Sequence, residues 1–242
     1  MKNDITKKGD TNMEELGNYL RLNGVLTDTP EYGHEVFGEK FYYATLSVPR
    51  LSGAEDLLPV TLSERLMEGG RFEAGTPLSF EGQLRSYNKV IEGSGRLLIT
   101  GFAQRLMDPM SDENPNQVQL TGALCKLPSY RTTPFGREIA DLMLAVNRAY
   151  GKSDYIPCIT WGRTARFASH LKVGDRVTLL GRFQSRDYQK QLPDGTVISK
   201  TAYEVSVGRL AMAENAPAVT YPAAREPMED TQTVPPGYYP QQ

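Results

Sequence analysis

An internal repeat constrains this chain more than any other feature. When the 242-residue sequence is shifted by 98 residues against itself, positions 18–63 align with positions 116–161 without a gap. Identical residues occupy 14 of these 46 positions, where ordinary composition would give roughly three. The chain therefore contains two copies of one fold. We place the first copy at 16–108 and the second copy at 116–214.

The second copy carries the clearest secondary-structure pattern. Period-2 alternation with β-branched and aromatic residues predicts strands over 118–126, 139–150, 155–161, 176–188 and 200–210. Between the third and fourth of these, Ala165, Ala168 and Leu171 recur at three-residue spacing, which predicts a short amphipathic helix over 163–171. Five strands with one helix in that place are typical of the oligonucleotide-binding (OB) barrel.

The first copy follows the same plan with a small change of offset. After the helix the offset becomes 99, which aligns Gly82 with Gly181 and Ser86 with Ser185. The sequence thus predicts an all-β (mainly β) protein of two tandem five-stranded OB barrels, each with one short helix. We expect a disordered N-terminus at 1–15, a short linker at 109–115 and a disordered Pro- and Gln-containing tail at 215–242.

Enzyme chemistry has little support in the residue pattern. The two histidines fall in different copies, and the acidic residues of the second copy are scattered over turns rather than clustered as metal ligands. Cys125 and Cys158 lie in predicted strands and read as small buried hydrophobes in a reducing cytosol. We expect neither an enzyme nor a cofactor or metal site, and no export signal or membrane span points away from the cytoplasm.

The second copy resembles the bacterial single-stranded DNA-binding proteins over about a hundred residues. The resemblance rests on glycines, strand positions and basic residues that agree along the whole domain. They are Asn116 with Val118, Leu120 and Gly122, then Pro128, Gly136, Leu144 to Arg148, Trp161 to Arg163, Gly174 to Val177, Gly181, Arg182, Ser185, Arg186 and Tyr203 to Val205. In that family bases stack on aromatic side chains at four positions, which here correspond to Tyr150, Tyr155, Trp161 and Tyr188.

Physical chemistry favours the same interpretation. One tyrosine in a β-strand is more often a packing residue than a DNA-binding residue. Four aromatic residues on one expected groove favour base stacking instead, which contributes about 1–3 kcal/mol per base and does not depend on the base sequence. Basic residues that can neutralise phosphates lie within a few positions of these aromatics. They are Arg148, Lys152, Arg163, Arg182 and Arg186.

The two copies differ at the positions that matter for this function. Opposite the four aromatics, the first copy has Ser52, Leu57, Ser63 and Lys89. Its 9 Lys and Arg against 12 Asp and Glu give a net charge of −3, whereas the second copy has 14 against 8, or +6. We therefore expect the second copy to face the polyanion and the first copy, a degenerate one, to serve a structural task.

The leading hypothesis is a cytoplasmic protein that coats single-stranded DNA during replication, recombination or repair. The alternative is a primosome-like or mobile-element adaptor that acts mainly through protein contacts. The family's tail usually ends in an acidic cluster that recruits replication and repair proteins. This sequence ends in Tyr-Tyr-Pro-Gln-Gln and lacks that acidic tip, so replication or repair proteins are one alternative for the tail and a solvated spacer is the other. The resemblance implies an assembly of four barrels, because family members with one barrel per chain are tetramers. A chain with two barrels reaches four by dimerising, so we expect a homodimer.

Overall fold

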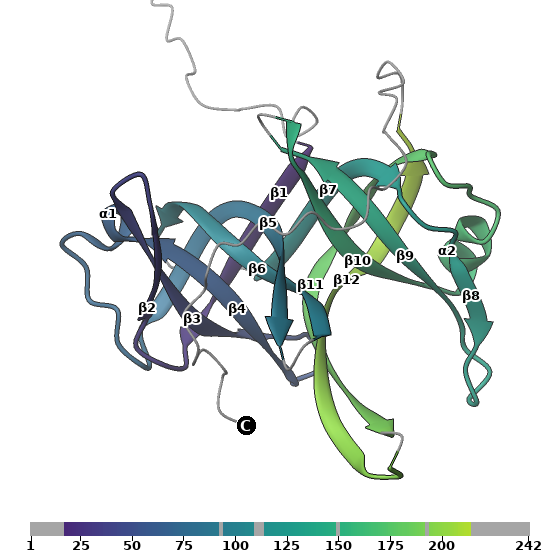
Figure 1. The fold of residues 1–242 in the computed structure, drawn as a ribbon, viewed down its shortest axis with the longest axis horizontal. Coiled ribbons are helices and arrows are strands. Elements are labelled where there is room, and N and C mark those ends of the chain that lie inside the picture. Colours follow the sequence, from purple (N-terminus) through teal and green to yellow (C-terminus); the bar gives the residue numbers. More distant parts are fainter. Residues whose placement is uncertain (1–16, 92–93, 109–113, 149–150, 192–193, 214–242) are drawn as a thin grey trace, which may run out of the picture.

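The computed structural model describes residues 17–91, 94–108, 114–148, 151–191 and 194–213. The expected disordered N-terminus and tail, and most of the expected linker, lie outside the described residues. The described strands join into one continuous sheet that curls into two barrels standing side by side (Figure 1). This confirms the predicted all-β tandem OB fold.

The two barrels repeat the same order of elements. The first contains β1 (Asn18–Leu26), β2 (Glu31–Val36), β3 (Glu39–Pro49), β4 (Glu55–Ser63), α1 (Glu64–Met67), β5 (Pro77–Ile91) and β6 (Ser94–Met107). The second contains β7 (Asn116–Leu124), β8 (Ser129–Thr132), β9 (Glu138–Asn147), β10 (Ser153–Trp161), α2 (Gly162–Ala168), β11 (Arg176–Gln191) and β12 (Val197–Met212). All of them lie within 16–108 and 116–214, which we keep as the proposed domain boundaries.

Each barrel closes through the strands that the sequence predicts. In the second barrel β7 pairs with β11 and β9, β11 pairs with β12, and β9 pairs with β10. A short parallel contact between β12 and β10 completes the circle. The first barrel closes in the same way through β1, β5, β6, β4 and β3. The short edge strands β2 and β8 are additional to the expected five. Among the described strands, β2 pairs with β3 alone and β8 with β9 alone.

Alternation along the strands fills the two cores. The core of the first barrel contains the fully buried side chains of Leu20, Leu22, Leu46 and Phe80. The core of the second barrel contains those of Leu120, Leu144 and Phe183. The helix α2 ends at Ala168 and not at Leu171, but all three spaced residues Ala165, Ala168 and Leu171 are buried as expected. Because β11 shifts register at Gly181, its Cα comes close to the neighbouring strand; a Cβ there would overlap the Ser206 carbonyl oxygen.

The two barrels meet through their first strands. β1 and β7 pair antiparallel over Asn18–Leu22 and Asn116–Leu120, and Leu20 pairs with Val118, its own equivalent in the repeat. An approximate two-fold axis therefore passes through this residue pair. Asn18 and Asn116 also extend the pairing inside each barrel, because each buried side-chain amide bonds both the N–H and the carbonyl of one residue on the next strand, Leu84 and Phe183 respectively.

A reciprocal polar contact, which we call the inter-barrel lock, reinforces this junction. Asp56 of the first barrel pairs with Arg50 and accepts a 2.8 Å hydrogen bond from the Ser185 backbone N–H of the second barrel, while Arg50 Nη2 donates to the Ser185 carbonyl oxygen at 2.8 Å. The two-fold equivalent joins Arg148 and Asp154 of the second barrel to Ser86 of the first.

The hydroxyl groups of the two serines also form hydrogen bonds in the inter-barrel lock. Leu57 N–H donates to Ser185 Oγ at 3.2 Å, and Tyr155 N–H donates to Ser86 Oγ at 2.8 Å. The two carboxylates at its centre are almost completely buried, with side-chain exposures of 1% for Asp56 and 0% for Asp154. Buried charges of this kind need their full set of partners.

We expect Asp56→Asn and Asp154→Asn each to lower the free energy of unfolding by about 3 kcal/mol, because each change leaves arginines at a buried site without their counter-charge. Urea denaturation followed by circular dichroism measures this. Asp141→Asn is the matched control, since Asp141 and its partner Arg131 are 39% and 48% exposed and such a surface pair contributes about 0–1 kcal/mol. Equal losses in all three variants would contradict the lock.

Candidate nucleic-acid interface

Three of the four expected base-stacking residues are described, and all three are accessible. Tyr155, Trp161 and Tyr188 have exposed fractions of 41%, 38% and 39%. Tyr150 lies outside the described residues. Large aromatic side chains of strands usually pack inward, so three partly exposed rings in one barrel are available to a ligand.

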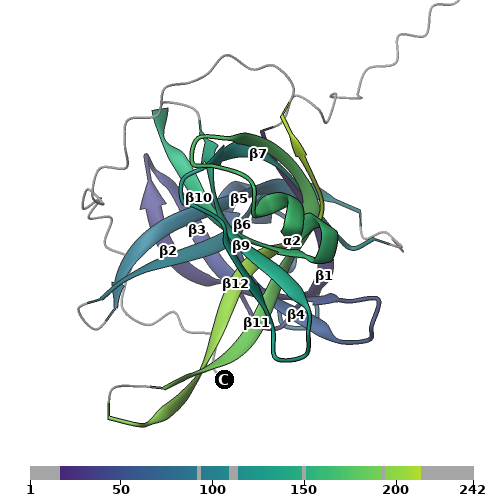
Figure 2. The same ribbon diagram turned by 90° about the vertical axis from the view of Figure 1, so that its right-hand side faces the viewer.

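Strand geometry explains how these rings are presented. Tyr155 and Trp161 share one face of β10, since they are separated by an even number of residues. Ile156 and Cys158, on the opposite face, are buried in the core. Tyr188 lies on the long β11–β12 hairpin, which extends well beyond the barrel (Figures 1 and 2).

A groove of about 540 Å³ runs beside Trp161 and across the junction of the two barrels. Trp161 Nε1 donates to Ser206 Oγ at 3.3 Å, which fixes the edge of the indole ring against β12. Most of the polar lining comes from the second barrel, but Arg50 and Glu55 come from the first. The lining residues are Arg50, Glu55, Arg137, Trp161, Arg182, Gln184, Ser185, Arg186, Asp187 and Ser206.

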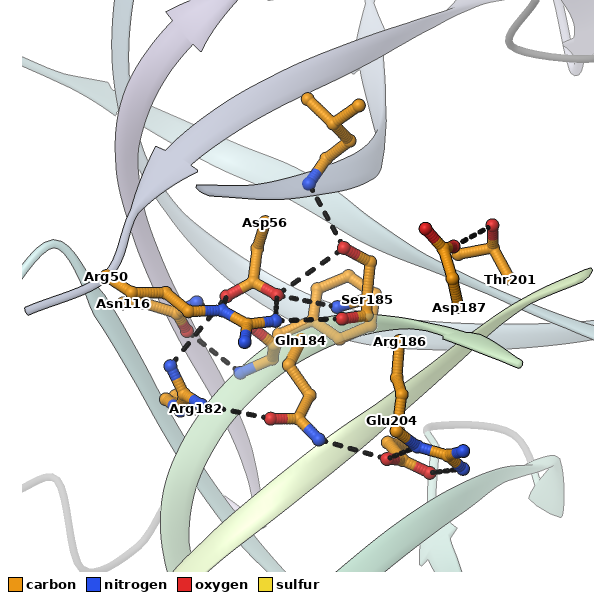
Figure 3. A network of polar contacts seen from close by, with 12 residues as sticks. Arg50, Asp56, Asn116, Arg182, Gln184, Ser185, Arg186, Asp187, Thr201 and Glu204 are labelled. Atoms are coloured by element: carbon orange, nitrogen blue, oxygen red, sulfur yellow. Dashed lines mark hydrogen bonds and ion pairs between the residues drawn. The ribbon is translucent and has the colours of Figure 1, made fainter. Parts of the chain in front are cut away.

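Two of the predicted phosphate-binding arginines lie in this groove beside carboxylates. Arg186 makes a two-pronged contact with the buried Glu204 at 3.0 and 3.3 Å, and this hydrogen bond raises the pKa of the guanidinium. The Arg186 guanidinium also lies over the Tyr188 ring, 5.9 Å from its centroid. Arg182 donates to Gln184 Oε1 and lies 3.8 Å from Asp56 (Figure 3). Each cation is thus held in place before any ligand arrives.

The other predicted basic residues have different surroundings. Arg148 is engaged in the inter-barrel lock and is 26% exposed. Its backbone N–H bonds the Lys152 carbonyl oxygen at 2.7 Å, and the Lys152 side chain is exposed. Arg163, at the start of α2, is exposed, and within the described ranges its side chain forms no ion pair.

The first barrel holds part of this interface in position. Four hydrogen bonds tie Ser185 to Arg50, Asp56 and Leu57 (Figure 3). Ser185 comes immediately before Arg186, on the same strand as Tyr188. On the other side of the two-fold axis, Ser86 of the first barrel holds the backbone N–H of Tyr155. Both the Tyr155 and the Tyr188 strands are therefore anchored by the first copy.

The equivalent surface of the first barrel has its aromatic residue on a different strand. The parallel strand contacts align Ser206 with Phe102, and the repeat aligns Trp161 with Ser63. Where the second barrel has an exposed Trp beside a Ser, the first barrel therefore has a buried Ser63 beside a Phe. The Phe102 ring is covered by the Arg85 guanidinium, 5.8 Å from its centroid, and packs against Phe41. This aromatic cluster packs within the first barrel.

Metal-binding and thiol chemistry find no support in the residues that the structure covers. Among them, no group of three or more His, Cys, Asp or Glu side chains could hold a metal ion. Burial raises the pKa of the Cys158 thiol, as expected for a core residue. Cys125 is only half-buried, with its Sγ donating to the Met143 carbonyl oxygen, so the expectation of a buried residue was wrong there. No helix in the described ranges is long and apolar enough to cross a membrane.

Several residues of the groove were not found from sequence. Arg137 follows the β8–β9 turn and was counted only in the charge total, while Gln184 and Ser206 carry no distinctive signal. Arg50 and Asp56 were visible as identities with Arg148 and Asp154 in the repeat. That shared pair was the available sign that both copies keep a polar contact for a structural reason.

Comparison with known proteins agrees with the fold. The model of the single-strand binding protein family matches residues 115–213. Single-stranded DNA-binding protein B of Bacillus subtilis (strain 168) is 37% identical over 83 residues, which cover 31% of this chain and 74% of that protein. Single-stranded DNA-binding protein A of the same organism is 41% identical over 83 residues, covering 31% of this chain and 48% of the relative.

The solved structures extend the likeness to both barrels. The crystal structure of the wild-type single-stranded DNA binding protein from Thermus aquaticus matches with a TM-score of 0.61 and 25% identity, covering 83% of this chain and 95% of that one. The fold and the exposed aromatic groove define a tandem OB-fold protein. Together with the sequence relatives, they show that this chain belongs to the single-strand binding protein family. The chain spans about half the length of two of these relatives. It covers 48% of single-stranded DNA-binding protein A of Bacillus subtilis and 50% of single-stranded DNA-binding protein 1 of Staphylococcus aureus (strain COL).

Proposed function

We propose that this protein binds single-stranded DNA without sequence preference, through base stacking on the second barrel and phosphate neutralisation along its groove. The observation that carries this proposal is the exposed Trp161, held by Ser206 beside Arg182 and Arg186 in a groove that crosses the two barrels. Stacking suits every base because each has a π-face. Membership of the family supports the same ligand.

The stacking surface consists of Tyr155, Trp161 and Tyr188, with Tyr150 proposed as a fourth position from the family resemblance. The three described rings come from β10 and from the β11–β12 hairpin, so a strand that follows them runs along one side of the second barrel. The first barrel anchors the backbone of both elements through the inter-barrel lock, at Tyr155 and at Ser185. This support limits the loss of backbone entropy when DNA binds.

We assign phosphate contacts to Lys152, Arg163, Arg182 and Arg186. Arg182 and Arg186 are held by neighbouring side chains, so a phosphate would share them with Gln184 and Glu204 and would gain preorganised donors. Arg148 has its guanidinium bonded to Asp154 and to the Ser86 carbonyl oxygen. Its proposed contribution to DNA binding acts through this lock and the adjoining strand of Tyr155.

The cellular role that we propose is protection of exposed DNA strands during replication, recombination or repair in the cytoplasm. Binding of other proteins through the tail at 215–242 is part of the same proposal, although that segment lies outside the described residues. An adaptor that acts mainly through protein contacts becomes the better explanation if the isolated protein does not bind oligo(dT). No enzymatic step is needed, and the family is one of DNA-binding proteins.

Substitution of the stacking residues tests the proposed function. We expect Trp161→Ala and Tyr155→Ala each to weaken the binding of labelled oligo(dT) by about 1–3 kcal/mol, the contribution of one stacked base. Leu57→Ala is the control, because Leu57 is the repeat equivalent of Tyr155 and is similarly exposed, at 48% against 41%. Fluorescence anisotropy measures the three affinities. Equal losses of affinity from substitutions in both barrels would mean that both copies bind the DNA.

The charge contribution can be measured through salt dependence. Each phosphate neutralised on a single strand contributes about −0.7 to the slope of log K against log salt. We expect Arg163→Gln to reduce the magnitude of the slope by about this amount. Arg65→Gln, its repeat equivalent on α1 with a side chain that is 77% exposed beside Glu39, should leave the slope unchanged. A wild-type affinity that does not vary with salt would refute the phosphate contacts.

The proposed assembly is a homodimer with four barrels. The chain already contains two barrels related by an approximate two-fold axis, and two-fold dimers are the commonest closed assemblies of soluble proteins. We expect a mass of about 54 kDa, twice the 26.9 kDa of one chain. Size exclusion with light scattering at micromolar concentration measures it, and a monomer or a tetramer of chains would contradict this assembly.

A further inference from the structure

An exposed phenylalanine at the tip of the β8–β9 hairpin has no packing role. Phe135 is 92% exposed, although it belongs to the apolar residues that normally leave water. Three hydrogen bonds define the turn that carries it. Gly136 N–H donates to the Thr133 carbonyl oxygen at 2.8 Å, Thr133 N–H donates to the Arg137 carbonyl oxygen at 2.8 Å, and Arg137 N–H donates to Thr133 Oγ1 at 3.1 Å.

This hairpin tip lies next to the groove. Ile139 pairs with Trp161 across β9 and β10, and Arg137, two residues before Ile139, is itself part of the groove lining. Phe135 lies two residues before Arg137, so its Cα lies within about 7 Å of the Arg137 Cα. The β8–β9 and β11–β12 hairpins also project on the same side of the second barrel (Figures 1 and 2).

The electrostatic setting of the tip suits a polyanion. Arg137 is exposed, and within the described residues its side chain has no carboxylate partner. Pro134 precedes Phe135 and restricts the backbone of the turn, which keeps the residue at the tip of the hairpin. An aromatic ring next to an available guanidinium is the combination that binds a nucleobase and its phosphate.

The chain provides its own comparison on the first barrel. Phe37 is the repeat equivalent of Phe135, lies at the tip of the β2–β3 hairpin and is also fully exposed. Its neighbours are Glu35 and Glu39, where the second barrel has Thr133 and Arg137. A bulge between Tyr32 and His34 shifts the register of that hairpin, and Phe37 has a positive φ of 50°. The two tips thus share an exposed ring but differ in charge and backbone.

We propose that Phe135, with Arg137 beside it, forms an additional nucleobase-stacking position that extends the single-stranded DNA path beyond Trp161 to the β8–β9 tip. This inference rests on the proposed function of the groove. The ligand is a single-stranded base with its adjoining phosphate. Phe37, between two carboxylates, takes no part in the path.

Affinity measurements on matched tip variants test the proposal. Phe135→Ala should weaken oligo(dT) binding by between about 5-fold and about 150-fold, the range for loss of one stacked base. Phe37→Ala should stay within about two-fold of the wild type, as is usual for an exposed position without a ligand. Because both rings are exposed, neither change disturbs the core. An unchanged affinity in Phe135→Ala, with normal wild-type binding, overturns the inference but leaves the proposed function standing.

A fluorescence experiment reports stacking directly. The chain has a single tryptophan, so Trp161→Phe combined with Phe135→Trp places the only indole at the tip. Oligo(dT) should quench this fluorescence, whereas the same design with Phe37→Trp should show no quenching. No quenching at the β8–β9 tip overturns the inference.

Light scattering separates a DNA contact from a protein contact at the same residue. Phe135→Ala should keep the wild-type mass, as should Phe37→Ala. A changed mass, with unchanged affinity per chain for oligo(dT), would overturn the inference and assign Phe135 to an interface between copies. Failure of the wild type itself to bind oligo(dT) would instead refute the proposed function.

Discussion

The pairing of β1 with β7 is the contact on which the arrangement of this protein depends. It places Leu20 opposite Val118, joins the two barrels into one continuous sheet and fixes their relative orientation. The inter-barrel lock then ties β4 and Arg50, which follows β3, to β11. It likewise ties β10 and Arg148, which follows β9, to β5, and each half contains one buried carboxylate. The groove forms where these elements meet, which is why it takes Arg50 and Glu55 from the first barrel and its aromatic surface from the second.

This arrangement gives the degenerate copy a definite task. Its own surface is acidic overall and its Phe102 is covered by Arg85, yet it donates and accepts the hydrogen bonds that hold Ser185 and the backbone of Tyr155. Retention of the fold therefore requires no base stacking by the first barrel. The polar residues of the lock and the apolar residues of the barrel are sufficient reasons for the similarity between the copies.

Sequence alone predicted the parts of the molecule that depend on local periodicity. Alternation along the strands and the spacing of Ala165, Ala168 and Leu171 follow from burial on one face, so the barrel strands and the helix were found. The edge strands β2 and β8 were missed because they are short, and β8 has no buried residue to produce a pattern. The end of α2 was placed three residues too late, because Leu171 is buried from the turn that follows the helix.

Contacts between the copies could not be read from local pattern. Arg148 lies close in sequence to the expected stacking residues, so proximity suggested a phosphate contact, whereas its guanidinium bonds Asp154 and the carbonyl oxygen of Ser86, 62 residues away. The placement of Arg137 beside Trp161 likewise depends on the pairing of β9 with β10. Such contacts follow from the three-dimensional register, and a single sequence contains no direct record of it.

The approximate two-fold axis through Leu20 and Val118 has an evolutionary consequence. In an assembly of identical one-barrel subunits, every mutation appears in all barrels at once, so a change that helps one surface and harms another is difficult to retain. Covalent linkage of two barrels removes that restriction, and each copy can accumulate substitutions separately while the junction stays self-complementary. The exchange of a Trp and Ser pair for a Ser and Phe pair on equivalent strands is an example of divergence that a strictly symmetric ancestor could not have fixed on one barrel alone.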